Sequence, residues 1–282
     1  MEVSFTKMHG CGNDFVIIDA TRTLKNWRPS ALQAAYLLDR HFGIGGDQLL
    51  LLYSSDCADA RMAIFNADGS EVEMCGNGIR CCALYLKDRG IVSGNEQVIE
   101  TLAGPIKPII QGDLVRVNMG MPILDANDIP VAGITGRVIE VPVPEINSAF
   151  PLPGVTCVSM GNPHAVFFVD DADAVPLEEV GSQVERLPLF PNRTNVEFAQ
   201  VVARDSIRMR VWERGSGITL ACGTGACGTV VAGILTARLD SRVTVILDGG
   251  DLTIDWAGEG SPVWMTGPAR EVFNGTVQLE DA

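Results

Sequence analysis

The stretch from Asn66 to Leu86 reads NADGSEVEMCGNGIRCCALYL, and the rest of the chain is interpreted around it. After Cys75 the apolar residues recur at positions i, i+3, i+4 and i+7, which is the spacing of one helix face. We therefore expect a helix over Gly76–Arg89, with Cys75 at its N-terminus. Backbone N–H groups without a partner inside the helix favour an anion there, and they favour a thiolate over a thiol.

The same pattern returns later in the chain, where Cys222 is followed by Gly-Thr-Gly as Cys75 is followed by Gly-Asn-Gly. Polar residues precede the two cysteines at matching distances. These residues are Asn66 and Glu213 (9 residues before), Gln48 and Asn195 (27 before), and Asn13 and Asn162 (62 and 60 before). Because several positions stay in register, the sequence indicates an internal duplication.

The duplication and the order of apolar runs predict an α/β (α+β) fold with two pseudo-symmetric halves. Each half is expected to be a curved, mostly antiparallel sheet wrapped around a central helix, with the active site in the cleft between the halves. The central helices are expected at Gly76–Arg89 and Gly223–Leu239, and shorter helices at Ser30–Arg40 and Leu177–Leu187. The second central helix is apolar almost all round, which is typical of a buried helix.

Composition excludes several classes of function. The net charge of −14 over 282 residues argues against nucleic acid or an anionic membrane as a partner. No run approaches the ~20 apolar residues of a membrane span. The eight cysteines form no CxxC pair and there are three histidines, so we expect no metal site. No secretory signal is visible at the N-terminus, so reduced thiols and a cytoplasmic location are expected.

Two thiols at equivalent helix N-termini suggest a specific chemistry. If they lie on opposite sides of one carbon, one can remove a proton from one face while the other returns a proton to the opposite face. That reaction is a racemisation or epimerisation. The backbone N–H groups best placed to stabilise the negative charge developing beside a carboxylate are those of Gly76, Asn77, Gly223 and Thr224.

Other candidate residues stay ambiguous on the pattern alone. The remaining six cysteines lack a partner in the repeat and are expected to be small buried hydrophobes. His164 follows Gly161-Asn162-Pro163 and fits a turn histidine as well as a site residue. Glu213 and Arg214 fit an exposed ion pair, although their place in the repeat favours the cleft.

Through these motifs the chain resembles the diaminopimelate epimerase family, whose members are cofactor-independent and act in lysine and cell-wall precursor synthesis. The segments that carry the resemblance span nearly the whole chain, in the order of the family. They are Met8–Phe15, Gly43–Gln48, Asn66–Arg80, Gly161–His164, Asn192–Glu197, Glu213–Ala226 and Thr266–Ala269.

The resemblance implies a two-cysteine acid/base mechanism that interconverts LL- and meso-diaminopimelate, with Cys75 and Cys222 as catalytic residues. It implies that His164 and Glu213 set the protonation of the thiols. The side chains implied in substrate binding are Asn13, Gln48, Asn66, Asn162, Asn195, Glu213 and Arg214, and the backbone clamp on the reacting carboxylate is Gly76, Asn77, Gly223 and Thr224.

The resemblance also implies an organisation of the chain. The C-terminal strands of the family return to the first half, so the N-terminal half comprises 1–119 completed by 263–282, and the C-terminal half comprises 120–262. A homodimer is implied, with Phe273 near the position of an aromatic residue in the family's dimer contact. The expected ligand is a small amino acid, with no cofactor and no metal.

Three alternatives remain open. A two-cysteine proline or hydroxyproline racemase carries histidine where this chain has Asn77, and proline lacks a distal carboxylate to which Arg214 is suited. An isomerase of the same fold without cysteines is disfavoured because both thiols are present. A thiol-based redox or metal-binding protein is the last choice.

Overall fold

The computed structural model describes residues 1–21, 24, 27–73, 75–144 and 146–279. The chain divides into two compact units. Unit 1 comprises Met1–Val117 and Gly267–Ala282, and unit 2 comprises Asn118–Thr266. The limits expected from the sequence, 1–119 with 263–282 and 120–262, differ from these by a few residues. Within the described residues, no helix is both long enough and apolar enough to cross a membrane.

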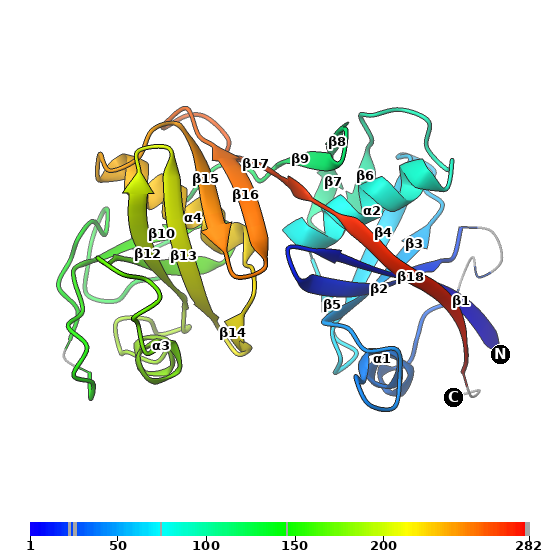
Figure 1. The fold of residues 1–282 in the computed structure, drawn as a ribbon, viewed down its shortest axis with the longest axis horizontal. Coiled ribbons are helices and arrows are strands. Elements are labelled where there is room, and N and C mark those ends of the chain that lie inside the picture. Colours follow the sequence, from blue (N-terminus) through cyan, green and yellow to red (C-terminus); the bar gives the residue numbers. More distant parts are fainter. Residues whose placement is uncertain (22–23, 25–26, 74, 145, 280–282) are drawn as a thin grey trace. The chain divides into compact units, whose positions relative to one another are not determined.

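Unit 1 is built on an eight-stranded sheet in the order β18-β1-β2-β3-β4-β6-β7, with β5 paired to β4. In Figure 1 the last strand, β18 in red, runs beside the first, β1 in blue. The elements of this unit are β1 (Glu2–Gly10), β2 (Asn13–Asp19), α1 (Ala31–Leu38), β3 (Gln48–Tyr53), β4 (Ala60–Phe65), β5 (Glu71–Val72), α2 (Gly76–Asp88), β6 (Ile99–Thr101), β7 (Gly104–Ile106), the hairpin strands β8 (Ile109–Gln111) and β9 (Leu114–Asn118), and β18 (Arg270–Gln278).

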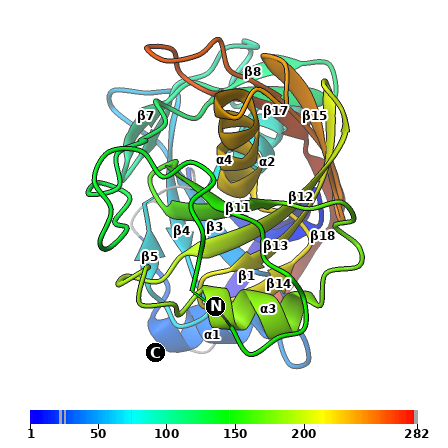
Figure 2. The same ribbon diagram turned by 90° about the vertical axis from the view of Figure 1, so that its left-hand side faces the viewer.

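Unit 2 carries its strands in the order β10-β11-β12-β13-β15-β16-β17, with β14 paired to β13. Figure 2 shows α4 against the strands of this unit. The elements are β10 (Val155–Ser159), β11 (Pro163–Phe168), α3 (Leu177–Val184), β12 (Asn195–Ala203), β13 (Ser206–Glu213), β14 (Gly217–Thr219), α4 (Gly223–Leu235), β15 (Arg242–Leu247), β16 (Gly250–Asp255) and β17 (Trp264–Pro268).

The two units repeat one topology. In unit 1, β1/β2 is antiparallel, β2/β3 parallel, β3/β4 and β4/β5 antiparallel, β4/β6 parallel and β6/β7 antiparallel. The same sequence of directions runs from β10 to β16 in unit 2. A short helix follows the second strand, and a 13-residue helix follows β5 in one unit and β14 in the other. The internal duplication predicted from the sequence is therefore present in the fold.

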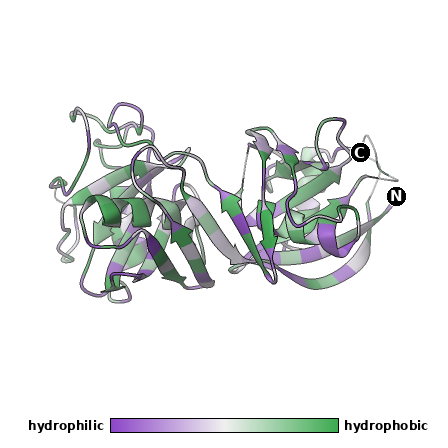
Figure 3. Ribbon diagram, turned by 90° about the horizontal axis from the view of Figure 1, so that it is seen from above, coloured by the Kyte–Doolittle hydropathy of each residue, from purple (hydrophilic) through white to green (hydrophobic). Residues whose placement is uncertain are grey.

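Each sheet buries both of its faces. In unit 1, Val16, Ile18, Leu49 and Leu51 belong to the cluster that includes Leu37 of α1. Since neighbouring side chains on a strand point to opposite faces, the residues between them face α2. In unit 2 the cluster around α3 contains alternate residues of β11 and β12 in the same way. The hydropathy colouring of Figure 3 shows green, for hydrophobic residues, along strands and helices of both units.

The helix starts agree closely with those expected, but α3 and α4 end three to four residues early, α3 at Val184 rather than Leu187. Ser30 caps α1 through a capping box, as its position before Ala31 suggests. The helix expected over Gly223–Leu239 ends at Leu235 instead. Ala237 adopts φ 57°, and the N–H groups of Arg238 and Leu239 both bond the carbonyl of Gly233, which closes the helix before the apolar run ends.

Candidate active site

The two predicted thiols occupy the same structural position in their units. Cys75 is the N-cap of α2 with φ −139° and ψ 116°, and Cys222 is the N-cap of α4 with φ −122° and ψ 110°. Both residues are extended and lead directly into a helix whose first N–H groups have no partner within the helix. The Cys75 sulfur accepts a hydrogen bond from the N–H of Gly78 at 3.4 Å. Each unit thus presents one thiol at a helix N-terminus.

Strand register identifies which residues correspond between the units. The pairing of β2 with β3 sets Phe15 opposite Gln48, and the pairing of β11 with β12 sets His164 opposite Asn195. The position of His164 in unit 2 is therefore taken by Phe15 in unit 1. Glu197 lies two residues after Asn195, and Leu50 lies two residues after Gln48. Glu197 therefore corresponds to Leu50.

Unit 2 places a buried polar pair beneath α4. His164 Nδ1 lies 2.6 Å from Glu197 Oε1, and both side chains are fully buried. The other ring nitrogen, Nε2, lies 3.1 Å from Oδ1 of Asn162. Burial raises the pKa of Glu197, and the neighbouring His164 opposes this. The pair links a buried carboxylate to an amide that the sequence predicts to bind substrate.

The Cys222 thiol lies among anionic groups in an enclosed position, since only 4% of the residue is exposed. Burial, followed by the negative charges of Glu213 and Glu197, raises the pKa of this thiol well above its usual value. The hydroxyl of Thr224, 3.5 Å from the sulfur, acts in the opposite direction. Glu213 itself accepts a hydrogen bond from Thr219 Oγ1 at 2.5 Å. The environment of Cys222 therefore favours the protonated thiol.

In unit 1 the corresponding thiol has amide neighbours. Oδ1 of Asn13 accepts from Nδ2 of Asn77 at 3.1 Å and lies 3.9 Å from the Cys75 sulfur. Nδ2 of Asn13 donates to Asp47 at 2.8 Å. Because Asp47 needs a donor, this bond fixes the orientation of the Asn13 amide and turns its carbonyl toward Cys75. Three residues predicted for the site are thus connected within unit 1.

A charged cluster holds Asp47 and the end of β2 in place. Arg40 contacts both Asp14 and Asp47 at 2.7 Å, and Lys7 contacts Asp14 at 2.6 Å. Although burial acts to raise it, the pKa of Asp14 is lowered by its hydrogen bonds to Arg40 and Lys7 and by their charges. This cluster lies outside the helix contact, whereas the charges of unit 2 lie beneath its helix.

The other predicted binding residues are paired within their own units. Gln48 Nε2 donates to Asn66 Oδ1 at 3.0 Å in unit 1. In unit 2, Asn195 uses both ends of its amide on the main chain, donating to the carbonyl of Pro163 and accepting from the N–H of Arg214, each at 2.9 Å. Asn195 therefore positions the backbone that carries Arg214.

One cysteine differs from the sequence-based expectation, and the residue expected near a dimer contact lies at the surface. Five of the six cysteines expected in the core are buried, but Cys57 is exposed beside Ser55 and Glu100, because its turn lies at the surface. Phe273 lies on β18, is 47% exposed and makes an edge-to-face contact with Phe5 at 5.8 Å.

Sequence reasoning did not single out Glu197, whose carboxylate contacts His164. A signal for it was available, because Glu197 is a charged residue inside the otherwise apolar start of the strand that begins at Asn195, at the position that Leu50 occupies in the first half. Arg80 of α2 was also missed; it is fully buried and donates to the carbonyls of Gly76 and Pro268.

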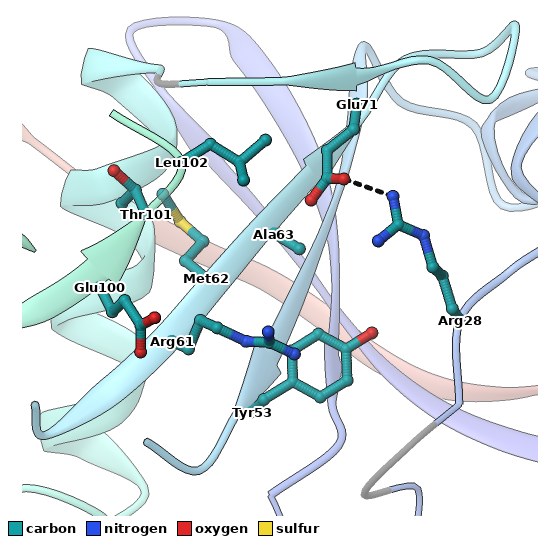
Figure 4. A pocket seen from close by; sticks show the side chains of 9 residues that line it. All are labelled: Arg28, Tyr53, Arg61, Met62, Ala63, Glu71, Glu100, Thr101 and Leu102. Atoms are coloured by element: carbon teal, nitrogen blue, oxygen red, sulfur yellow. Dashed lines mark hydrogen bonds and ion pairs between the residues drawn. The ribbon is translucent and has the colours of Figure 1, made fainter. Parts of the chain in front are cut away.

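The cavity drawn in Figure 4 does not contain either thiol. It encloses about 250 Å³ in unit 1, and Arg28 and Glu71 form an ion pair across it. Its two arginines lie over aromatic rings, Arg61 over Tyr53 at 4.6 Å and Arg28 over Phe65 at 4.9 Å. Among the residues that the structure describes, no three His, Cys, Asp or Glu side chains converge as a group that could hold a metal ion.

Comparison with known proteins gives a consistent result. The model of a family described as diaminopimelate epimerase matches residues 5–124 and 156–272. The diaminopimelate epimerase of Pelotomaculum thermopropionicum is 51% identical over 276 residues, covering 96% of this chain and 97% of the relative. That of Moorella thermoacetica is 52% identical over 282 residues, covering 98% and 99%.

Solved structures share the fold at low sequence identity. A PhzF-family phenazine biosynthesis protein of Bacillus anthracis aligns with a TM-score of 0.72 at 18% identity, covering 99% of this chain and 100% of that chain. A hydroxyproline epimerase from Agrobacterium vitis aligns with a TM-score of 0.69 at 17% identity, covering 99% and 93%. At this level of identity the likeness concerns architecture alone.

Proposed function

Since the chain belongs to the diaminopimelate epimerase family and is an epimerase of lysine biosynthesis, we propose that it interconverts LL- and meso-diaminopimelate by a two-cysteine acid/base mechanism without a cofactor. The observation that carries the proposal is the equivalence of Cys75 and Cys222, each the N-cap of a 13-residue helix in a duplicated fold. The proposed location is the cytoplasm.

The proposed reaction moves one proton in each of two steps. One cysteine, as the thiolate, takes the α-proton of the substrate and becomes a thiol. The resulting carbanion, stabilised through its carboxylate, takes a proton from the other cysteine, which becomes a thiolate. Product and substrate differ only in configuration, so atoms and charge balance, and the two thiols have exchanged their protonation states.

The carboxylate next to the reacting carbon needs hydrogen-bond donors, and the hydrogen bonds to it must become stronger as negative charge develops. The proposed donors are the backbone N–H groups of Gly76, Asn77, Gly223 and Thr224, which lie in the first turns of α2 and α4. Helix N-termini carry partial positive charge and fixed N–H groups, so they stabilise the developing anion without reorganising.

The unreacting end of diaminopimelate carries a second ammonium and carboxylate. We assign its recognition to Glu213 and Arg214 together with the amides of Asn66, Asn162 and Asn195. Because buried polar groups left unpaired are costly, a site built for these charges rejects ligands that lack them. Lysine and alanine are therefore expected to be poor substrates.

The direct test is to incubate the purified, reduced protein with LL-diaminopimelate and to resolve the stereoisomers over time. We expect meso-diaminopimelate to appear without added cofactor and in the presence of a chelator. Turnover of proline with none of diaminopimelate would move the assignment to the racemase branch, and a strict requirement for an added cofactor would overturn the proposed chemistry.

Deuterated water tests the use of two bases. If each face of the carbon has its own cysteine, early product carries deuterium at the inverted carbon while recovered substrate gains little. Deuterium that enters recovered substrate faster than inversion occurs would indicate that a single base serves both faces.

We further propose a homodimer that uses the β18 surface around Phe273. This strand is an edge of its sheet, and Val272 and Phe273 are about half exposed on it. Sedimentation of the native protein and of Phe273→Ser tests this. A native dimer that the substitution shifts toward monomer is expected, and a native monomer would refute it.

A further inference from the structure

Glu197 is buried at a position where the fold itself does not require a carboxylate. The corresponding residue of unit 1, Leu50, supports the same helix contact with methyl groups, 3.3 Å from the point that a Cβ on Gly78 would occupy. Burying a carboxylate costs free energy unless it is paired. Because a carboxylate lies under α4 and not under α2, we expect Glu197 to have a function that has no counterpart in unit 1.

The first contact of Glu197 is His164, at 2.6 Å through Nδ1. Because a ring nitrogen that faces an amide oxygen must carry the proton, the 3.1 Å contact with Asn162 Oδ1 requires a proton on Nε2. The other ring nitrogen, Nδ1, faces the carboxylate of Glu197. Glu197 therefore fixes the ring of His164, and through it the amide of Asn162.

Glu197 also lies close to the Cys222 thiol, beside the first turn of α4. A Cβ built on Gly225 would lie 2.7 Å from Glu197 Oε1 and 3.3 Å from the Cys222 sulfur, so both atoms border the same point in the first turn of α4. The second carboxylate oxygen, Oε2, is buried and has no hydrogen-bond partner among the described residues. Oε2 therefore has no donor of its own among these residues, and the charge of the carboxylate is offset only by His164 on the other oxygen.

We propose that Glu197 is a positioning residue of the reaction, which orients His164 and keeps the proton on Cys222 in the free enzyme. This rests on the proposed function and adds a residue beyond His164 and Glu213. The effect on the thiol is that of a like charge opposing formation of the thiolate. It makes the two cysteines unequal before substrate arrives.

Several titratable or polar groups surround Glu197 and Cys222. They are His164 on β11 and Glu213 on β13, which act on Glu197, Cys157 on β10, on which Glu197 acts, and Thr224 on α4, which acts on Cys222. Burial, followed by the charge of Glu197, also raises the pKa of Cys157. A test must therefore isolate the titration of Cys222 from that of Cys157.

The experiment titrates the thiolate absorbance of the free protein in the ultraviolet, each protein being compared with its own Cys222→Ser counterpart, so that the difference reports Cys222. Glu197→Gln removes the charge with little change of shape. We expect the midpoint of Cys222 to fall by about one to three pH units. The matched control is Glu185→Gln, another buried carboxylate of unit 2, which bonds the Trp212 indole and does not act on Cys222.

An unchanged midpoint in Glu197→Gln, or an equal shift in Glu185→Gln, overturns the proposal. If Glu197→Gln does not fold, the pair His164→Phe/Glu197→Leu copies the apolar arrangement of unit 1 and carries the same expectation. The titration needs no turnover, so its failure is separate from failure of the native protein to epimerise diaminopimelate.

Discussion

The two thiol-bearing helices have the same position in a duplicated fold and very different surroundings. Beneath α4 lie a fully buried histidine and glutamate, and beneath α2 lie Phe15 and Leu50 at the matching positions. Unit 1 keeps its acidic groups, Asp14 and Asp47, in a cluster outside the helix contact. The duplication thus preserved the geometry of the thiol and changed the electrostatics around it. Such a difference lets two identical groups hold different protonation states.

The largest expected effect on turnover comes from removing either thiol, because both units share the geometry of this group. Cys75→Ala and Cys222→Ala are each expected to reduce kcat by at least about 10²–10⁴-fold, the usual contribution of a positioned acid or base. Stereoisomer analysis measures this. Cys227→Ala serves as the control, because Cys227 is buried in α4 and corresponds to Arg80 rather than to a thiol. Near-normal turnover in either variant would contradict the use of both thiols.

The next effect concerns the buried pair. His164→Phe leaves Glu197 in the core without its partner, and we expect a loss of about 3–5 kcal/mol in the free energy of unfolding. Adding Glu197→Leu should recover most of this loss, since the double variant reproduces the Phe15–Leu50 contact of unit 1. Denaturant unfolding of the single and double variants measures the coupling. Equal instability of the two would show that the units differ in more than these residues.

A smaller effect comes from equivalent glycines in the two first turns. At Gly225 an added Cβ would lie 2.7 Å from Glu197 Oε1, whereas at Gly78 it would meet a Leu50 methyl at 3.3 Å. We expect Gly225→Ala to cost about 1–3 kcal/mol through overpacking. Gly78→Ala should be near neutral, because the leucine can shift and alanine favours the helix by about 1 kcal/mol. Thermal unfolding compares them, and the reverse order would refute the explanation.

The smallest expected effect, on KM, comes from the hydrogen bond between Asn13 and Asp47 that orients the Asn13 amide in unit 1. Asp47→Ala frees the Asn13 amide to rotate, so we expect KM to rise about tenfold, the equivalent of one hydrogen bond of 1–1.5 kcal/mol, with kcat little changed. Asp47→Asn keeps an acceptor and should be milder. Thr194→Ala, at the corresponding position of unit 2, removes no contact to Asn162 and is the control. A fall in kcat alone would point to a different role for Asp47.

The sequence predicted the duplication because glycines and cysteines at helix starts have a strong local signature. Cys75 and Cys222 were located to the residue, since N-cap positions depend on a few neighbouring residues. The sheets were expected to be mostly antiparallel, and among the described residues each unit also contains two parallel strand pairs. The end of α4 was predicted too late, because Ala237 in a left-handed conformation carries no sequence signal of the kind that glycine gives.

The partners of side chains were harder to predict than their positions. Alternation along β12 assigns Glu197 to the face toward α4, but it does not show that His164 of a neighbouring strand lies within hydrogen-bonding distance. Similarly, the sequence places Asn195 among the candidate binding residues without showing that its amide bonds the main chain on both sides. Such pairings depend on strand register, which a single sequence does not fix.

The pairing of β18 with β1 has a consequence for synthesis. The register runs from Glu2 opposite Gln278 to His9 opposite Arg270, and the amino group of Met1 bonds the carbonyl of Leu279 at 2.5 Å. Chains emerge from the ribosome N-terminus first, so every residue of unit 2 is available while unit 1 still lacks β18. Until β18 has been synthesised, β1 remains an open edge that other strands can pair with. A protein cut short before Arg270 therefore keeps both thiols yet carries an unprotected sheet edge.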